Sequence, residues 1–498
     1  MLARFAWVLP VGMSAAVYWS LVQNYFFSDD FVHLWTLVND GLGRFLLEMH
    51  AGHLYVVRNL VFALHYWLFG MHPAPYFWTV LAVHLLNVYL LFLTARALTD
   101  SWRLGATVAA LWGMAPVQEG TLGWYSVFGH ALAGTCTLWV LSRLMRWRSG
   151  ESPSRLAIAL AALVMIAGGS CFGVGIGTAL VMPAIAWLLL PAGRARTSAT
   201  LALASAGAFV ALEYFTVKRL NLELFGVISL TTIPALPYLW QTLHLAVALA
   251  GYSLVAFALG SFNRTGLYSG TAGTVVLVAW VLLAALALVR GPRHTWRALL
   301  ACALLAAGVY GMIAMGRLAI AASFGLDLTV QITRYHYVGM VAAALALAIV
   351  LRGAVAVEGA PTWSKNTVFA AWAVASLIAA RALNPPINHF DVARRETAQT
   401  LAAIAAAGRQ QPPGADLYLP NQPFRSVGAM LVNNLAAFPG RAAVFALFHP
   451  DDMVEGRRVF FVIDDPDTLR AARHGQRAAR LLRGPDEMGS PAGMPQLR

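Results

Sequence analysis

Charged residues are scarce in this chain. Only 11% of its 498 residues are Asp, Glu, Lys or Arg, whereas 59% are hydrophobic. A soluble domain has about a quarter of its residues charged, so this composition excludes an ordinary soluble fold. Long apolar runs recur through the first three quarters of the chain, as in a protein whose helices cross a bilayer repeatedly. The sequence therefore predicts an all-α polytopic membrane protein.

Cysteine is also scarce, with three residues in the chain, and nucleotide-binding glycine fingerprints are lacking. Cys136, Cys171 and Cys302 each lie inside or beside an apolar run, which indicates neither a disulfide framework nor a metal cluster. The Gly-x-Gly-x-Gly series at 173–177 falls within an apolar segment, so we interpret it as a site of close helix packing. No nucleotide-binding fingerprint opens a predicted helix of the more polar C-terminal part.

The net charge of +13 does not indicate nucleic-acid binding, because the arginines lie mainly in short loops between apolar runs. We predict 14 Lys and Arg residues in cytoplasmic loops and 7 in the longer outer loops. By the positive-inside rule, this bias places the N-terminus in the cytoplasm and the C-terminus outside. About 11–13 transmembrane helices are expected, with spans near 5–23, 76–95, 104–115, 125–141, 156–166, 174–190, 201–217, 274–289, 298–315, 337–351 and 368–380.

One apolar stretch, 236–259, does not fit a simple count of crossings. The arginine-rich loop at 290–297 has a cytoplasmic composition, and a single crossing at 236–259 would move that loop outside. We therefore interpret 236–259 as re-entrant, as interfacial, or as split into two short passes.

The composition changes after about residue 381, where prolines become frequent and long apolar runs end. Strands are predicted at 416–419, 443–448 and 459–463, and helices at 391–408 and 467–482. The chain is thus divided into a transmembrane domain, 1–382, and a small α/β extracytoplasmic domain, 383–498, which has a normal domain size.

Two adjacent acids, Asp29 and Asp30, follow the first apolar span within the predicted outer loop 24–75. Carboxylates near hydrocarbon are costly, so this pair is a candidate for function, although a solvated helix end would show the same residues. The loop also holds an aromatic helical pattern at 52–70 that contains Arg58, which suits a helix lying along the membrane interface.

Several short motifs on the outer side occur in a characteristic order. They are Asp29–Asp30–Phe31, then His53 and Arg58, then Leu68–Phe69–Gly70–Met71–His72–Pro73 with Tyr76, then His84–Leu85–Leu86–Asn87, then Ala115–Pro116–Val117–Gln118–Glu119 with Trp124, and Arg334–Tyr335–His336–Tyr337 before a later span. This order resembles the GT-C superfamily of membrane glycosyltransferases, in particular the branch of protein O-mannosyltransferases and aminoarabinose transferases. The chain departs from that branch at Asn59 and Ala115, where the branch often has proline and histidine.

The resemblance implies an inverting transfer of a sugar from a polyprenyl-phosphate donor to an envelope glycan, lipid or protein on the outer face of the cell (inner) membrane. It favours Asp30 over Asp29 as the general base, a choice that spacing alone leaves open. A second acid near the base would orient it or bind a divalent metal; no other cofactor is implied. Outer-side residues expected to contact the donor phosphate or lipid are Arg334, Arg58, Tyr335, His336, Lys218 and Arg219.

For the other candidate residues, a purely structural role is an alternative to a role in the site. We expect His53, Glu119 and His33 to line the acceptor side of the site, although Glu119 is also suited to a helix cap. Arg58 also suits headgroup contact, and Tyr335 and His336 an interfacial belt. The histidines at 53, 65, 72 and 84 lack the spacing of a metal site. Two other functions stay open: a cell-envelope polysaccharide polymerase or ligase that uses a lipid-diphosphate glycan, and a transporter, which should show an internal repeat and mid-membrane charges.

Overall fold

The structure, a computed structural model, describes residues 5–354 apart from 28, 40, 50, 51, 71, 226–237, 260–270 and 293, together with 416–419 and 458–461. Up to residue 354 its elements are all helical. They are α2 (Val8–Tyr18), η1 (Trp19–Gln23), α3 (Asp29–Asn39), α4 (Gly41–Leu47), α5 (Val56–Phe69), α6 (Pro73–Thr99), α7 (Trp102–Gly113), η3 (Pro116–Gln118), α8 (Glu119–Leu122), η4 (Tyr125–Val127), α9 (Gly129–Arg148), α10 (Arg155–Gly169), α11 (Gly173–Leu189), α12 (Arg194–Phe225), α13 (Leu239–Leu259), α14 (Thr271–Arg290), α15 (Thr295–Phe324), α16 (Leu326–Val330), η5 (Thr333–Tyr335) and α17 (Gly339–Ala354).

Five of the described helices, α6, α12, α13, α14 and α15, are long and apolar enough to cross a membrane. Shorter apolar helices, among them α10, α11 and α17, lie beside them. The all-α polytopic class predicted from composition is confirmed on this ground, while the total of 11–13 crossings stays a prediction.

Local chemistry sets several helix ends. Pro73 lies in the first turn of α6, where its missing N–H removes no intrahelical hydrogen bond. The helix is followed by Asp100, whose φ of 54° is left-handed and ends the helical path. Ser101 caps α7 by accepting a hydrogen bond from the backbone N of Leu104 at 3.3 Å. Short polar breaks thus separate apolar helices that return side by side.

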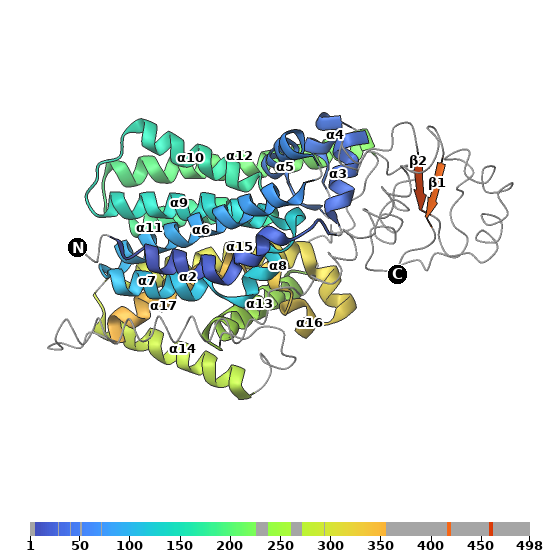
Figure 1. Ribbon diagram of the computed structural model, residues 1–498. Coiled ribbons are helices and arrows are strands. Elements are labelled where there is room, and N and C mark those ends of the chain that lie inside the picture. The colour runs from blue at the N-terminus through green and yellow to red at the C-terminus, as the bar shows by residue number, and fades with distance from the viewer. Residues whose placement is uncertain are drawn as a thin grey trace.

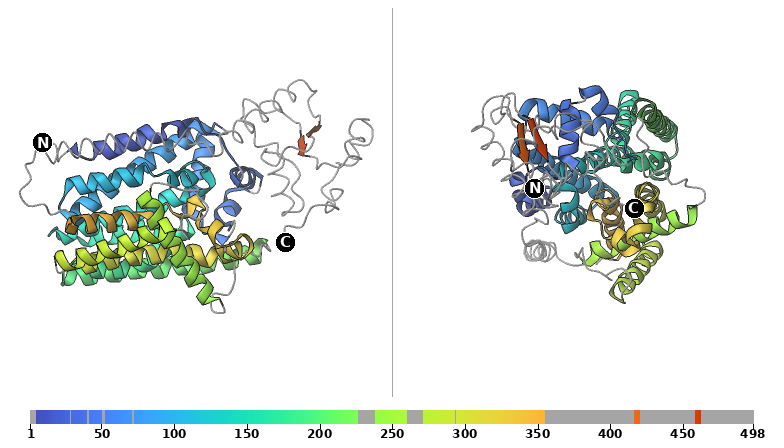
Figure 2. Two further views of the ribbon diagram at one scale, coloured as in Figure 1. Left: turned by 90° about the horizontal axis from the view of Figure 1, so that it is seen from below. Right: turned by 90° about the vertical axis from the view of Figure 1, so that its right-hand side faces the viewer.

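The long helices run alongside one another and give the bundle two distinct ends (Figures 1 and 2). At one end, Arg352 Nη2 lies 2.9 Å from Asp100 Oδ2, which joins the end of α17 to the α6–α7 turn. Arg148 and His294 line the same small crevice as Arg352. The loops after α9 and α11 also meet there. We call this the arginine-rich end, because it gathers the loops predicted to be cytoplasmic.

The opposite end, which we call the cavity end, holds α3, α4 and α16 (Figure 1). The last turns of α12 and α15 reach it too, carrying Lys218 and Arg317 to one cavity described below. The segments predicted to be outer loops are therefore grouped together, away from the arginine-rich end.

The glycine series at 173–177 packs helices closely, as the sequence indicates. A Cβ atom at Gly177 would overlap the carbonyl oxygen of Gly308 in α15, and one at Gly175 would overlap the carbonyl of Gly168. Because a side chain at either position would push the backbones apart, these glycines allow α11 to approach α10 and α15. They hold together α11 and α15, which both contribute residues to the wall of the cavity described below.

The stretch at 236–259 is not split into two short passes; that interpretation is wrong. Its described part is one unbroken helix, α13, of 21 residues. Tyr252 packs against His336 with ring centroids 5.2 Å apart, and the Leu254 carbonyl accepts a hydrogen bond from Trp280 Nε1 of α14 at 3.3 Å. Gly251 lies in the middle of this run without breaking the helix, so the backbone hydrogen bonds stay within one segment, as a membrane requires. The connections on either side, 226–237 and 260–270, lie outside the described residues.

The C-terminal part contains two described strands, β1 (Asp416–Leu419) and β2 (Arg458–Phe461), which pair in parallel with Asp416 opposite Arg458. They coincide with two of the three predicted strand positions. The third predicted strand, the predicted helices at 391–408 and 467–482 and the predicted span at 368–380 lie outside the described residues. The α/β domain at 383–498 therefore stays a prediction.

Candidate functional site

A cavity of about 660 Å³ opens at the cavity end. Its charged lining residues are Asp29, Lys218, Arg317 and Arg334. They come from the start of α3, the end of α12, the end of α15 and η5, so four segments distant in sequence share one space. Residues from α11, α12 and α15 form an apolar wall that includes Ile176, Phe215, Met312, Met315 and Ile320. The cavity is thus amphipathic, with acid and cations beside an apolar wall.

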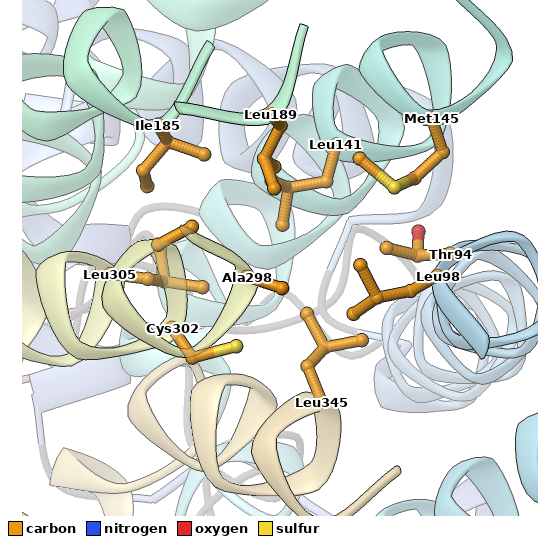
Figure 3. A pocket seen from close by; sticks show the side chains of 11 residues that line it. Thr94, Leu98, Leu141, Met145, Ile185, Leu189, Ala298, Cys302, Leu305 and Leu345 are labelled. Atoms are coloured by element: carbon orange, nitrogen blue, oxygen red, sulfur yellow. The ribbon is translucent and has the colours of Figure 1, made fainter. Parts of the chain in front are cut away.

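A much smaller cleft lies toward the arginine-rich end, between α6, α9, α11, α15 and α17 (Figure 3). Its volume is about 20 Å³, enough for about one water molecule. Thr94 has the polar side chain on its lining, Met145 and Cys302 carry sulfur, and the others are aliphatic. Without a charged group, this cleft lacks the chemistry of a catalytic site.

The two adjacent acids face different surroundings. Asp29 lines the cavity and is partly exposed, whereas Asp30 is fully buried and is not among the cavity-lining residues. Successive residues on a helix point about 100° apart, and at the start of α3 this rotation turns Asp29 to the cavity and Asp30 into the protein. This geometry moves our choice of general base from Asp30, which the sequence favoured, to Asp29.

Asp30 connects two segments beneath the cavity. Its Oδ2 accepts a hydrogen bond from the backbone N of Phe27 at 2.8 Å, and its Oδ1 accepts one from the backbone N of Ser126 at 2.6 Å as well as one from the Ser126 hydroxyl. Burial raises the pKa of Asp30 to about 7, although the hydrogen bonds from Ser126 and Phe27 oppose this rise. Asp30 therefore holds η4 against the start of α3 and orients Asp29. Ser126 has no sequence signal that points to this role.

Arg334 lies on the cavity lining between two aromatic rings. Its guanidinium carbon is 5.2 Å from the Trp124 ring centroid and 5.3 Å from that of Tyr335. The Thr121 hydroxyl donates to the Arg334 carbonyl at 3.4 Å, and a side chain at Gly120 would overlap Thr333. The two outer motifs, 115–124 and 334–337, therefore pack together and present Arg334 to the cavity, as the sequence predicts.

Arg317 is a site residue that sequence reasoning missed. The predicted span near 298–315 ends before it, but α15 continues to Phe324, so Arg317 lies within the helix and is only 9% exposed. Its Nη2 contacts His53 Nε2, and its guanidinium carbon is 5.9 Å from the Tyr335 ring centroid. The signal available in the sequence was an arginine that interrupts an apolar run, which is costly unless it has a function or a partner.

Lys218 and Arg219 are adjacent in sequence but lie in different surroundings. Lys218 lines the cavity, as expected. Arg219 points elsewhere: its Nε lies 2.7 Å from Glu223 Oε1, and both side chains are more than half exposed. Arg219 was predicted to contact the donor. In the structure it instead forms a surface ion pair with Glu223, one helical turn away.

Arg58 is fully buried behind the cavity wall, so it neither lines the cavity nor reaches lipid headgroups. Its guanidinium carbon lies 4.0 Å from the ring centroid of Tyr55, which does line the cavity. Its Nη2 donates to His33 Nε2 at 3.1 Å, and it interacts favourably with the charge of Asp30. The predicted roles of Arg58 in phosphate binding and of His33 in site lining are replaced by support of the wall and of Asp30.

The other predicted site residues also divide into those that line the cavity and those that do not. His53 and Tyr335 line the cavity, whereas His336 is buried outside it, where Nε2 donates to the Val330 carbonyl at 2.7 Å and Nδ1 accepts from Tyr310 Oη at 3.2 Å. Burial lowers the pKa of His336 to about 4, which keeps the ring neutral. Glu119 starts α8 and is not on the cavity lining, in keeping with a role at a helix end.

Three polar atoms of the lining residues are buried without a hydrogen-bond partner in the described chain: Trp124 Nε1, His130 Nδ1 and Tyr335 Oη. Buried polar groups are rarely left unsatisfied, so these atoms are suited to a polar ligand or ordered water. Among the described residues, no group of three or more His, Cys, Asp or Glu side chains comes together as a metal site. The cavity thus brings one carboxylate together with three cationic side chains.

No known protein-family model matches the chain, and no curated protein is significantly similar to it. The assignment of a function therefore depends on the geometry of this cavity and on the short motifs that meet there.

Proposed function

We propose that this protein is an integral membrane glycosyltransferase of the GT-C type that transfers a sugar from a polyprenyl-phosphate donor to an envelope acceptor. The observation that carries this proposal is the single cavity in which Asp29 faces Arg334, Arg317 and Lys218 next to an apolar wall. A lipid-linked sugar phosphate has the matching parts: a hydroxyl-rich sugar, an anion and a hydrocarbon tail.

The apolar wall supports a lipid donor in particular. Phe215 and Met315 line the cavity and are 65% and 42% exposed. A surface that is apolar and exposed on a membrane helix faces lipid. A donor whose tail stays in the bilayer reaches the cavity between α12 and α15 without bringing its tail into water.

The transfer needs one base and an anion clamp. An acceptor hydroxyl oxygen attacks the anomeric carbon, the bond from that carbon to the phosphate oxygen breaks, and the acceptor proton passes to a carboxylate of Asp29. The phosphate leaves as an anion, so a general acid is not required. Arg334 and Arg317 would hold this phosphate through charge-assisted hydrogen bonds. The configuration at the anomeric carbon is inverted by a single displacement of this kind.

The decisive experiment separates transfer from donor binding. Asp29→Asn keeps the size of the side chain but removes the base, so we expect transfer to fall by about 10²–10⁴-fold while donor binding is retained. Donor binding is measured with a radiolabelled lipid-linked sugar, and transfer with the same donor and an envelope extract as acceptor. Asp327→Asn, on the exposed side of α16, is the matched control and should retain wild-type transfer. Near wild-type turnover in Asp29→Asn would exclude this residue as the base.

A second candidate is a polymerase or ligase of cell-envelope polysaccharide that uses a lipid-diphosphate glycan. It is favoured by the charge of the cavity lining, where three cations, Lys218, Arg317 and Arg334, accompany one carboxylate. A diphosphate would neutralise more of this charge than a monophosphate. Competition between undecaprenyl phosphate and undecaprenyl diphosphate for the labelled donor distinguishes the two, because tighter binding of the diphosphate supports the second candidate.

The orientation in the membrane is part of the proposal. We infer that the arginine-rich end is cytoplasmic, and that the cavity end and the C-terminal domain are periplasmic, because positive residues are retained in the cytoplasm. Single cysteines at positions 150 and 420 should react with a membrane-impermeant maleimide from opposite sides of sealed vesicles. Labelling of both positions from the same side would reject this orientation.

A further inference from the structure

A second large cavity, of about 470 Å³, lies at the arginine-rich end, where the α9–α10 loop meets the α11–α12 loop. Arg155, Arg194 and Arg196 line it together with Trp147. The proposed transfer uses none of these residues, and this cavity lies at the opposite end of the bundle from Asp29.

The starts of two helices converge on this cavity. Arg155 is the first residue of α10, and Arg194 is the first residue of α12. A helix N-terminus carries a partial positive charge, which acidic side chains in the first turn usually offset. Neither first turn contains an acid, so the arginines add to the positive charge of both helix ends. The arrangement favours a bound anion.

The acid on the lining does not cancel this charge. Glu151 Oε1 lies 3.2 Å from Arg143 Nη2, so its charge is shared with an arginine outside the cavity. Arg196 is held in place by Trp187, whose ring centroid is 4.1 Å from the guanidinium carbon. Its Nε is buried without a hydrogen-bond partner in the described chain, and the same is true of Nε1 of Trp147, a residue only 3% exposed. Ordered donors therefore surround the cavity.

Apolar surface continues from the cavity into the membrane. Ile158 and Leu190 are on the lining itself. Along α12, Leu201 and Leu212 follow Arg194 on the same helix face, at i+7 and i+18, and are 63% and 64% exposed. A ligand with an anionic head and a hydrocarbon tail would meet arginines at its head and leucines along its tail. A free phosphate or nucleotide would use only the first of these features.

We propose that this cavity binds the phosphate headgroup of an anionic phospholipid, with the acyl chains lying along α12. Basic pockets between membrane helices at the cytoplasmic face are suited to such headgroups. The lipid would join the α9–α10 and α11–α12 loops and fix the cytoplasmic ends of α10 and α12.

The test compares two double variants of the full chain by native mass spectrometry, with phosphatidylglycerol and phosphatidylcholine as the lipid probes. Arg194→Gln with Arg196→Gln removes two cavity arginines. Arg103→Gln with Arg297→Gln is the matched control, because both arginines lie at the same end, each near a tryptophan ring at 4.7 and 5.4 Å, and outside the cavity. Each cavity arginine should contribute about fivefold in affinity for phosphatidylglycerol, so we expect about a 30-fold loss in the first variant and less than twofold in the control.

Two further measurements keep the result unambiguous. Circular dichroism verifies that both variants keep their helices, and Arg155→Gln, a single change, replaces the double variant if the latter fails to fold. Glycerol 3-phosphate is added as a tail-free competitor, and little displacement is expected if the acyl chains contribute. Equal binding of phosphatidylglycerol and phosphatidylcholine, equal losses in the two double variants, or displacement by millimolar glycerol 3-phosphate would each overturn the proposal of a lipid site.

Discussion

The two ends of this bundle each gather arginines around a cavity, but in different surroundings. At the cavity end, Arg317 is 9% exposed and contacts His53, and Arg334 lies between Trp124 and Tyr335. At the arginine-rich end, Arg155 and Arg194 are exposed at helix starts. A buried, ordered cation is expensive and selects its anion by geometry, whereas an exposed one acts mainly through its charge.

The acids differ as clearly as the cations. At the cavity end, α3 begins with Asp29 and Asp30, whose negative charges are favoured at a helix N-terminus. At the arginine-rich end, α10 and α12 begin with arginines. One end therefore places a carboxylate and cations on one cavity, whereas at the other end the acids Asp100 and Glu151 are paired with arginines and the helix starts stay positive.

The largest effect that distinguishes the two ends should be the pH dependence of protein stability caused by Asp30. Burial raises its pKa to about 7 in the folded protein, against about 3.9 in an unfolded chain. The folded state therefore binds the proton more tightly, so this contribution to stability is present below about pH 4 and is lost as the pH rises through 7, by at most about 4 kcal/mol. The melting temperature should fall between pH 5 and pH 8.

Asp30→Asn cannot ionise and should remove this part of the pH dependence. Asp327→Asn, on exposed α16, should leave it unchanged. Melting is followed by intrinsic fluorescence in detergent. Parallel profiles for the wild type and Asp30→Asn would contradict the assignment of the buried charge.

The next effect concerns the anion at the cavity end. Arg334→Ala should weaken binding of the lipid-phosphate donor by about 10–100-fold, since hydrogen bonds to charged groups contribute about 1.5–3 kcal/mol. The donor affinity of Arg334→Lys should lie between those of the wild type and Arg334→Ala, because a point charge replaces a bidentate fork. Arg297→Ala, at the arginine-rich end, should bind the donor normally. Equal losses in Arg334→Ala and Arg297→Ala would mean that total charge, and not the cavity, governs binding.

A third prediction tests how the two ends are joined. Gly177→Ala should destabilise the protein by about 1–3 kcal/mol, because its new methyl group would overlap the Gly308 carbonyl. Gly311→Ala, where a methyl group meets nothing within 4 Å, should be neutral or stabilising. The two melting temperatures are compared with that of the wild type. A Gly177→Ala protein as stable as Gly311→Ala would refute close packing of α11 on α15.

The smallest effect distinguishes two adjacent cations. Lys218→Ala should weaken donor binding by about fivefold, because it removes a single charge from the cavity lining. Arg219→Ala should change it by less than twofold, since Arg219 pairs with Glu223 at the surface. Donor titration with both variants measures the difference, and equal losses would show that neither residue contacts the donor directly.

Much of the fold could be predicted from the pattern of apolar runs. The helices α6, α7, α10, α11, α12 and α15 fall where the hydropathy places spans, and the arginine loops meet at one end. The pattern fails at α13, because a charge count across loops does not reveal whether an apolar helix is interrupted. The apolar pattern also predicts an end near residue 315, before Arg317, whereas α15 continues to Phe324.

The site was predictable only in part. Motif order pointed to Asp29, His53, Arg334 and Tyr335, and the predicted outer-side charge pointed to Lys218; all five line the cavity. The sequence could not rank Asp29 above Asp30 or separate Lys218 from Arg219. Neighbouring residues give the same composition signal, although their side chains point about 100° apart on a helix. Ser126 and Arg317 were missed, as their roles depend on segments that are distant in sequence.

The sequence by itself determined the membrane class, the grouping of basic loops and the region where acids and arginines are concentrated. These follow from the transfer of side chains between water and hydrocarbon, which depends on each residue and its immediate neighbours. Only the tertiary structure decided which carboxylate faces the cavity, which arginines share it and which support its wall. Those outcomes depend on helix rotation and on contacts such as Asp30 with Ser126 and Arg58 with Tyr55, which join residues that no local pattern connects.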